Sequence, residues 1–574
     1  MKKKIDLEIY EPAHCLNKIY FWLQLPICSK DKKEILSKLQ DPHSNLIENF
    51  KSSLEFGTSG VRALMGPGPS YLNEVTIFSL SYALGHFINE GDLPKKSCVV
   101  GYDGRKNGAL FSQVVAQTLS FLGVDVFIIT NPVPVPLLAY AVTFYGAACG
   151  VMITASHNPK EYNGFKVYSS DGGEITEAQE MSIEHHIRNP EEIFRLYPFK
   201  GRDNYIHVVD ILRVRDSYFD ALKKLSIFSK SSIRKNSDLQ IVYSNLHGVG
   251  IHLIEEAFSR WGFKNLSLVS AEKEIRADFG KLTQPNPEDV AVFKEGIQFM
   301  MDKKADAVIV NDGDADRVGL CIPRKNHQYH IFTGNEMASL CTYYLCYRLK
   351  KMGDLPDKSV IYTTFVTTRL IDEIARDFQC YVVRVPTGFK FIAEEMRRSK
   401  KGPLVNLLVA IEESFGFLMG EYIKDKDGIA GALFLAEMVE DLKKEQRSCW
   451  DLLQSILRKY GYFKERQISW FVTEDKKIKI MDQIRGGKFC FLPLGPLEKI
   501  DDFLQDPIYP HNALRFEFKN RTQILVRPSG TESKLRMHIS VLDKTDNSSS
   551  KLLEDYSGYL KNAFQNLMRE LDAS

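Results

Sequence analysis

Nine short apolar runs, arranged as three sets of three, constrain the fold of this chain more than any other feature. Each run is apolar along its length, as expected of a strand covered on both faces, and helical patterns separate the runs. The alternation predicts three similar α/β units with mixed, largely parallel sheets. The runs comprise residues 98–105, 125–130 and 149–156, then 239–245, 266–270 and 306–313, and then 359–365, 380–386 and 407–414.

The C-terminal part has a different pattern, in which strands lie closer together and a long helical segment follows them to the end. This pattern predicts an α+β domain, whereas the first 50 residues predict a helical arm. A length of 574 residues agrees with about three to five domains. We therefore expect an arm at 1–50, α/β domains at 51–210, 211–328 and 329–455, and an α+β domain at 456–574.

The charge balance gives no general reason to expect nucleic acid or an anionic membrane as a partner. Lys and Arg total 75 and Asp and Glu total 73, so the net charge is +2. The 10 cysteines are scattered and form no C-x-x-C pair, which favours buried thiols in a reducing, cytoplasmic compartment. Asp6 and Glu8 interrupt the basic start, so we expect no signal peptide.

The longest apolar stretch runs from Leu137 to Ala155 and is long enough to raise the question of a transmembrane helix. Gly146 and Gly150 interrupt it, and the polar segment SHNPKEYN follows it directly. We interpret the stretch as a helix, a glycine break and a buried strand.

The sharpest local motif is NDGDADR, which follows the apolar run DAVIV. Asp312, Asp314 and Asp316 alternate in a loop at a strand end, where three carboxylates can converge on one hard cation. A solvated acidic turn is the alternative. An EF-hand does not fit, because the sixth and twelfth loop positions hold Arg317 and Pro323 instead of Gly and Glu.

A second motif, TASHNP, places Ser156 at the C-terminal end of an apolar run, where open α/β sheets bind their ligands. No G-x-S-x-G elbow surrounds this serine, which excludes an α/β-hydrolase. Lys166 lies just downstream and offers a cation to the same place. A turn with a helix cap is the alternative for the Ser-His pair alone.

Three further loops follow predicted strands. In RPSGTE, from Arg527 to Glu532, small residues and an arginine can surround a phosphate, although no Walker A motif is present. An ordinary turn is the alternative for this motif alone. PTGFK begins at Pro386, and EESFG begins at Glu412. The paired carboxylates of EESFG can hydrogen-bond vicinal sugar hydroxyls, and a helix N-terminus with acidic charge is the alternative.

Together these loops resemble the α-D-phosphohexomutase superfamily and, within it, the phosphoglucomutase/phosphopentomutase branch. The resemblance extends from LEFGTSGVRALMGPG at Leu54 to RPSGTESKLRMH ending at His538. It rests on TASHNP, DGDADR, EESFG and RPSGTE occurring together in this order. The superfamily implies four domains around a central cleft, each of which delivers one loop.

The resemblance also implies the chemistry of the site. Ser156 would carry the transferred phosphoryl group and bind Mg²⁺ together with Asp312, Asp314 and Asp316. Lys166 and Lys426, the latter from IKDKDG, would be the acid/base lysines. The substrate-binding residues would be Arg62, His157, Arg317, Thr387, Gly388, Glu412, Ser414, Arg527, Ser529, Gly530 and Thr531.

The implied reaction interconverts a hexose 1-phosphate and a hexose 6-phosphate, with glucose as the expected sugar and glucose 1,6-bisphosphate as activator. Gly416 stands where hexomutases of the phosphomannomutase/phosphoglucomutase type have a histidine, which weakens a dual mannose and glucose assignment and raises the importance of Lys426. A phosphopentomutase, a phosphomannomutase, a phosphosugar phosphatase and a non-catalytic sugar-phosphate binding protein remain as alternatives. The sequence predicts no oligomeric state.

Overall fold

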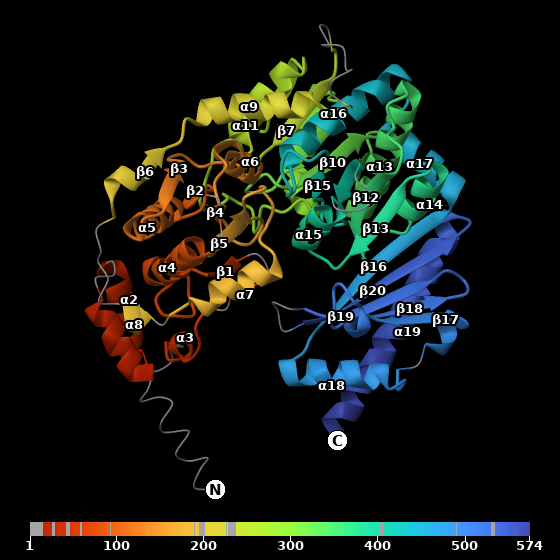
Figure 1. The fold of residues 1–574 in the computed structure, drawn as a ribbon. Helices are drawn as coiled ribbons and strands as arrows, with labels where there is room; N and C mark the ends of the chain where they lie inside the picture. The colour runs from red at the N-terminus through yellow and green to blue at the C-terminus, as the bar shows by residue number, and fades with distance from the viewer. Residues whose placement is uncertain are drawn as a thin grey trace. The chain divides into compact units, whose positions relative to one another are not determined.

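The fold is described from a computed structural model, in which the described part of the chain forms four β-sheets and their accompanying helices (Figure 1). The described residues are 15–25, 29–41, 46–54, 56–57, 60–91, 93, 95–188, 190–193, 201–225, 227, 237–400, 406–489, 491–529 and 534–573. The chain divides into two compact units. The first comprises residues 1–331, Phe389–Ser399 and Gly416–Glu440, and the second comprises Phe332–Gly388, Lys400–Phe415 and Asp441–Ser574.

The first sheet of the first unit has six strands in the order β1-β5-β4-β2-β3-β6. Its parallel part holds β4, β2, β3 and β6, and its antiparallel edge holds β1 and β5. Every residue of β2 and β4 is buried, which explains why these strands read as continuous apolar runs. The strands are β1 (Gly60–Leu64), β2 (Ser97–Tyr102), β3 (Asp125–Ile128), β4 (Cys149–Ile153), β5 (Tyr162–Ser169) and β6 (Ile206–Val208).

Five longer helices accompany this sheet, and their ends follow ordinary capping rules. Asn73 caps α4 by accepting hydrogen bonds from the backbone N–H groups of Val75 and Thr76. Gly146 ends α6 with a φ of 58°, a left-handed conformation that glycine adopts without strain. The helices are α4 (Glu74–Glu90), α5 (Gly108–Phe121), α6 (Val135–Tyr145), α7 (Glu177–His185) and α9 (Ile211–Lys223), with a short α8 (Pro190–Ile193).

The second sheet of the first unit has the order β11-β10-β9-β7-β8. Strands β9, β7 and β8 are parallel, and β10 and β11 form an antiparallel edge. The strands are β7 (Gln240–Ser244), β8 (Asn265–Leu268), β9 (Ala307–Asn311), β10 (Val318–Pro323) and β11 (Tyr329–Ile331), with helices α11 (Ile251–Arg260) and α12 (Lys294–Lys303).

Two segments from later in the chain complete the first unit. They contain helix α15 (Phe389–Ser399), strand β15 (Phe417–Leu418) and most of helix α16 (Gly428–Lys444). Arg397 of α15 donates two hydrogen bonds to the carboxylate of Asp171, both at 2.8 Å, and Lys424 Nζ lies 2.9 Å from the same carboxylate. These ion pairs hold both segments against the loop that follows β5.

The second unit contains a parallel sheet in which β12 (Ser359–Thr364) lies between β13 (Tyr381–Val385) and β14 (Asn406–Ile411). The helices of this part are α13 (Gly334–Met352), α14 (Leu370–Asp377) and α17 (Cys449–Tyr460). Because all three strands run in one direction, the loops after β13 and β14 start at the same edge of the sheet.

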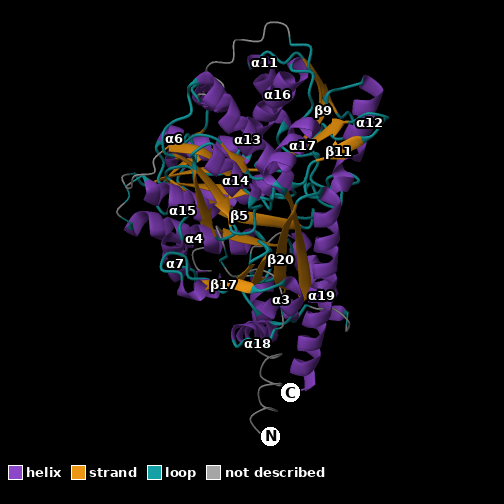
Figure 2. Ribbon diagram, turned by 90° about the vertical axis from the view of Figure 1, so that its right-hand side faces the viewer, coloured by secondary structure: helices purple, strands orange, loops and turns teal. Residues whose placement is uncertain are grey.

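The last domain, also in the second unit, is an antiparallel sheet in the order β16-β20-β19-β18-β17. Alternate residues of β20 are buried, as one covered face requires. Helix α19 packs along β16 and β20 (Figure 2). The elements are β16 (Tyr462–Phe471), α18 (Glu474–Arg485), β17 (Leu497–Asp502), β18 (Leu514–Phe518), β19 (Gln523–Pro528), β20 (Lys534–Asp543) and α19 (Asp546–Ala573).

The early part of the chain is helical over residues 15–24, in α2 (Ser29–Gln40) and in α3 (Glu48–Lys51). Trp22 packs edge-on against Phe50, with ring centroids 5.6 Å apart. Among the described residues, no helix is long and apolar enough to cross a membrane. The 137–155 stretch forms α6, the turn at Gly146 and strand β4, as predicted.

The fold class predicted from the sequence, three α/β domains followed by an α+β domain, is confirmed. The nine apolar runs form β2, β3, β4, β7, β8, β9, β12, β13 and β14, which belong to the three parallel arrays. Strand β6, which is also parallel, is not among these runs.

Candidate functional site

The loops after β4 and β9 meet in the first unit, although they belong to different sheets. Ser156 Oγ donates a hydrogen bond of 3.0 Å to Asp312 Oδ2, and the Val135 N–H donates one of 3.0 Å to the Asp314 carbonyl. Ser156 is 1% exposed and adopts a left-handed φ of 52°. A serine held in this uncommon conformation at a strand end fits a functional position.

Arg105 holds the Ser156 loop in shape. Its guanidinium donates to the carbonyl oxygens of Ser156 at 2.7 Å, Asn158 at 2.6 Å, Pro159 at 2.8 Å and Tyr162 at 3.0 Å. Four carbonyl groups therefore converge on one planar cation. Arg105 lies in the predicted strand segment 98–105, but nothing in its local pattern marked it for this task.

Thr154 links the serine loop to two carboxylates. Its hydroxyl accepts a hydrogen bond of 2.8 Å from the Ser156 N–H and lies 2.6 Å from Asp103 Oδ2 and 3.1 Å from Asp314 Oδ2. Burial raises the pKa of Asp103 to about 6, against the opposing charge of Arg105. The sequence interpretation missed Asp103 and Thr154 as parts of the site.

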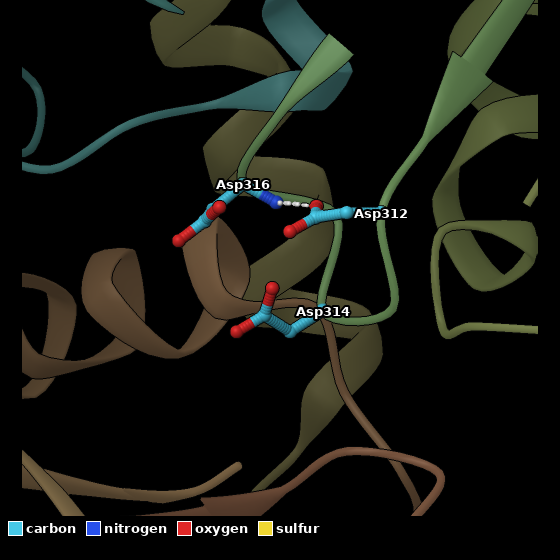
Figure 3. Close-up of side chains that lie close together, drawn as sticks. All are labelled: Asp312, Asp314 and Asp316. Carbon is cyan, nitrogen blue, oxygen red and sulfur yellow. Dashed lines mark hydrogen bonds between the residues drawn. The ribbon is translucent and has the colours of Figure 1, made fainter. Parts of the chain in front are cut away.

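Asp312, Asp314 and Asp316 point toward one another at the end of β9 (Figure 3). A carboxylate oxygen from each lies within 4.8 Å of the others, and all three side chains are buried. The Asp316 N–H donates a hydrogen bond of 3.1 Å to Asp312 Oδ1, whereas Asp314 Oδ1 and Asp316 Oδ1 have no hydrogen-bond partner. Buried carboxylate oxygens without donors fit a cation with oxygen ligands.

The charges of this cluster are unevenly compensated. Burial, with repulsion from Asp316 and Asp314, raises the pKa of Asp312 well above its usual range. Burial would also raise the pKa of Asp316, but the nearby ammonium groups of Lys426 and Lys166 outweigh burial and hold it well below its usual range. A bound cation would compensate the remaining negative charge.

Both predicted acid/base lysines reach Asp316. Lys426 Nζ lies 3.4 Å from Asp316 Oδ2, and Lys166 Nζ lies 3.7 Å from the same oxygen. Each lysine also contacts a second carboxylate: Lys426 Nζ is 2.9 Å from Asp425 Oδ1, and Lys166 Nζ is 3.7 Å from Glu174 Oε1. Both lysines are thus buried among carboxylates, and within the aspartate cluster they contact Asp316.

Three more predicted residues lie around this centre. Arg317 forms an ion pair of 2.7 Å with Glu288, and Arg62 is exposed on β1 opposite Gly164 of β5. His157 Nδ1 lies 3.3 Å from Ser156 Oγ. Burial, together with the charges of Arg317 and Arg62, holds the pKa of His157 well below its usual range, so this imidazole is neutral at physiological pH.

Asn311 joins the aspartate loop to the segment that carries Lys426. Its side-chain N–H groups donate to the carbonyl oxygens of Arg317 at 2.6 Å and Gly428 at 3.0 Å, and its oxygen accepts from Tyr243 Oη at 2.8 Å. A Cβ at Gly428 would lie 2.6 Å from the Arg317 carbonyl oxygen, so this close approach needs glycine. The sequence interpretation quoted Asn311 within NDGDADR without assigning it a role.

The predicted sugar-binding residues lie in the second unit. Glu412 and Ser414 follow β14, and Ser414 Oγ donates a weak hydrogen bond of 3.5 Å to Glu412 Oε2. Glu413 Oε2 instead accepts from Thr364 at 2.7 Å and Thr367 at 2.8 Å.

The second sugar loop starts at the same edge of this sheet. Thr387 and Gly388 follow β13, and Gly388 has a φ of 125°, a value that favours glycine.

The predicted phosphate loop follows β19 in the same unit. Arg527 lies opposite Arg536 of the neighbouring strand β20, and Lys477 Nζ donates a hydrogen bond of 3.0 Å to the Ser529 carbonyl. Burial and the charge of Arg536 lower the pKa of Arg527 to about 10, against the opposing charge of Glu413. Gly530 and Thr531 lie outside the described residues. Two neighbouring arginines and a lysine give this region the charge that an anion needs.

The structure thus places the predicted site residues in two groups. Ser156, the three aspartates and both lysines form one connected cluster in the first unit. The sugar and phosphate loops belong to the second unit.

Comparison with known proteins identifies relatives of all three α/β domains. Three family models match the chain, described as the alpha/beta/alpha domains I, II and III of phosphoglucomutase/phosphomannomutase. They match residues 53–194, 216–325 and 333–460.

Whole-chain relatives give the same result. A phosphoglucomutase of Staphylococcus epidermidis is 30% identical over 514 residues, which cover 86% of this chain and 92% of that protein. A phosphoglucomutase of Staphylococcus haemolyticus is 30% identical over 515 residues, covering 86% and 91%.

Two crystal structures share the fold. A phosphoglucomutase/phosphomannomutase family protein from Burkholderia thailandensis has a TM-score of 0.64 and 20% identity, covering 88% of this chain and 96% of that one. Parafusin, a phosphoglucomutase from Paramecium, has a TM-score of 0.64 and 19% identity, covering 89% and 95%.

Proposed function

Because this chain belongs to the phosphoglucomutase/phosphomannomutase family, and is therefore a phosphohexomutase, we propose that it interconverts glucose 1-phosphate and glucose 6-phosphate through a phosphorylated Ser156. The single observation that supports this proposal most is the hydrogen bond of 3.0 Å from Ser156 Oγ to Asp312, at the edge of a buried triple-aspartate cluster. The resemblance found in the sequence is confirmed at the level of the family.

Asp312, Asp314 and Asp316, with the Ser156 phosphate, are the residues that would hold Mg²⁺. When bound, the ion would neutralise charge on the phosphoryl oxygens and so favour transfer. The unpartnered oxygens of Asp314 and Asp316 support this assignment, as does the raised pKa of Asp312.

The protein's own residues would position and deprotonate the substrate. The 6-hydroxyl of glucose 1-phosphate would attack phosphorus, and a lysine in its neutral form would take the hydroxyl proton. The bond between phosphorus and Ser156 Oγ would break, and the serine oxygen would take up a proton to become a hydroxyl again. Lys426 and Lys166 are the candidates, since both lie within 3.7 Å of Asp316 Oδ2. When the bisphosphate returns a phosphoryl group to Ser156, the same lysine, now protonated, would donate its proton to the sugar oxygen that leaves phosphorus.

The sugar and the non-transferring phosphate would be bound by the loops of the second unit. Glu412 and Ser414, with Thr387 and Gly388, would contact sugar hydroxyls. The RPSGTE loop would bind the phosphate, and the guanidinium of Arg527 would donate two parallel hydrogen bonds to its oxygens. The resulting glucose 1,6-bisphosphate would turn over and return its other phosphate to Ser156, so added bisphosphate should activate enzyme that has lost its phosphoserine.

Mass spectrometry of the purified chain tests this function first, and we expect phosphate on Ser156. Ser156→Ala should lose nearly all mutase activity, whereas Ser182→Ala, at an exposed serine of α7, should keep it. Near-wild-type turnover by Ser156→Ala would disprove the phosphoserine mechanism. Assays with glucose 1-phosphate, mannose 1-phosphate and ribose 1-phosphate then rank the substrates, and stoichiometric release of free phosphate would indicate a phosphatase instead.

A further inference from the structure

Two cysteines of the second unit lie side by side away from the proposed site. Cys346 is on α13 and fully buried, and Cys380 lies in the turn between α14 and β13. The Cys346 thiol is hydrogen-bonded to the Cys380 sulfur, and the Cys380 thiol donates a weak hydrogen bond of 3.7 Å to the Phe378 carbonyl oxygen. Cys380 alone is not fully buried among the cysteines that the structure describes.

Two neighbours, Cys346 and Lys350, lower the pKa of Cys380. Lys350 follows Cys346 by one turn on α13, and its ammonium lies 5.4 Å from the centroid of the Phe378 ring. The hydrogen bond from Cys346, followed by the Lys350 charge, lowers the pKa of Cys380 against the effect of burial. The same hydrogen bond and burial raise the pKa of Cys346. A partly exposed thiol of lowered pKa beside a second thiol is the arrangement found in oxidisable cysteine pairs.

We propose that Cys346 and Cys380 form a modification site, a dithiol that hydrogen peroxide converts to a disulfide. The Cys380 thiolate would attack one peroxide oxygen, the O–O bond would break, and Cys380 would become a sulfenic acid as the other oxygen leaves as hydroxide and takes up a proton to become water. The Cys346 sulfur would then attack the Cys380 sulfur, form the S–S bond and release a second water. Two thiols and one peroxide give one disulfide and two waters, and a dithiol reductant reverses the change.

The chain contains a matched pair with the opposite environment. Cys98 and Cys149 lie directly opposite each other on the parallel strands β2 and β4, and both are buried. Burial, followed by the neighbouring Cys149 thiol, raises the pKa of Cys98 well above its usual range. Both thiols of this pair are buried, and the pKa of Cys98 is raised, so the pair should stay reduced under conditions that oxidise Cys346 and Cys380.

The experiment treats the full-length native protein with hydrogen peroxide, quenches it, and maps peptides without reduction. We expect a linked peptide pair joining Cys346 to Cys380, a loss of two hydrogen atoms, and reversal by dithiothreitol. Native labelling with iodoacetamide should modify Cys380 at least about tenfold faster than Cys98 or Cys149. Cys380 that stays a free thiol, or that links to another cysteine, would overturn the proposal.

A variant separates the two chemical steps. In Cys346→Ser the second step is blocked, so dimedone should trap a sulfenic acid on Cys380, whereas the wild-type protein should give little adduct. Equal trapping in both proteins would contradict a resolving role for Cys346. If this variant does not fold, the peptide map and the labelling rates of the wild-type protein are sufficient to test the proposal.

Discussion

Lys426 Nζ lies 3.4 Å from Asp316 Oδ2, so a predicted acid/base lysine contacts a predicted metal ligand directly. Asp316 also contacts Lys166, at 3.7 Å, and the two ammonium groups keep its carboxylate ionised. Phosphoryl binding beside this cluster would bring further negative charge, and proton transfer through either lysine would change the charge beside Asp316. The position of Asp316 thus couples the proton chemistry to the cation site.

Replacing Lys426 tests its part in proton transfer. Lys426→Ala should lower kcat more than it raises KM, because the lysine would act mainly in the transition state. General acid–base groups typically contribute about 10²- to 10⁴-fold. Lys51 is a control in the first unit, since it is exposed and pairs with Glu48 at 2.7 Å, away from every proposed site loop. Lys51→Ala should leave kcat and KM near the wild-type values. An unchanged kcat with a raised KM in Lys426→Ala would show that this lysine only binds substrate.

Removing divalent cations tests the aspartate cluster. Chelation should abolish activity and Mg²⁺ should restore it, after metal analysis has shown that the chelated protein is free of ions. Thermal unfolding gives an independent measurement, because Mg²⁺ at 100 times its Kd should stabilise the fold by about 2.7 kcal/mol. Asp312→Asn should lose most of this gain, whereas Asp278→Asn, at an exposed carboxylate paired with Arg276, should keep it. Full activity in excess chelator would exclude a catalytic ion.

Replacing Arg527 tests the phosphate loop. A charge-assisted hydrogen bond contributes roughly 1.5–3 kcal/mol, so Arg527→Ala should lower kcat/KM about ten- to a hundredfold. Glucose 1,6-bisphosphate should still phosphorylate Ser156 in this variant. Arg466 of β16 serves as the control, because it is half-buried in the same sheet and pairs with the exposed Glu554. An Arg527→Ala enzyme with unaltered KM and kcat/KM would remove this loop from substrate binding.

Glu465 of β16 should make the stability of the second unit depend on pH. It accepts a hydrogen bond of 3.3 Å from Asn335. Burial raises its pKa to about 7, and the charge of Glu336 adds to this effect. A carboxyl whose pKa is raised by folding stabilises the fold below its unfolded pKa and loses that contribution as pH rises through 7.

Glu465→Gln measures this contribution directly. Relative to the wild type, its free energy of unfolding should rise between about pH 4.5 and pH 8, by as much as roughly 3 kcal/mol. Glu554→Gln, at an exposed position of α19, should show no such trend. A difference between Glu465→Gln and wild type that is constant across this pH range would contradict the raised pKa.

The sequence predicts the parallel strands better than the antiparallel ones, for a physical reason. Strands such as β2 and β4 are buried on both faces and therefore read as unbroken apolar runs. Strand β5 was missed, although seven of its eight residues are buried, because it contains Asn163, Gly164 and Lys166. The charges of Asp316 and Glu174 compensate the buried Lys166. A local apolar pattern cannot indicate such partners, and Asp316 follows a strand of a different sheet.

The same reasoning explains which residues of the candidate site the sequence indicated. Ser156 and the three aspartates lie in short motifs whose residue types indicate a nucleophile and a cation site, and these residues lie close together in the structure. Arg105 was missed because it binds four backbone carbonyl groups. Every residue has such a group, so the sequence does not show which ones an arginine binds. Asp103 and Thr154 were missed for a similar reason, since their hydrogen bonds depend on the meeting of two strand ends.

The segment Gly416–Glu440 belongs to the first unit, although the chain builds most of another domain between residue 331 and this segment. On the ribosome, Ser156 and the aspartate loop therefore emerge long before Lys426. Until Lys426 is synthesised, Asp316 lacks one of its two lysines, and Asn311 lacks the Gly428 carbonyl group that it binds in the finished protein. A nascent chain or a fragment that stops at residue 331 would hold the serine and all three carboxylates and still lack a complete catalytic centre.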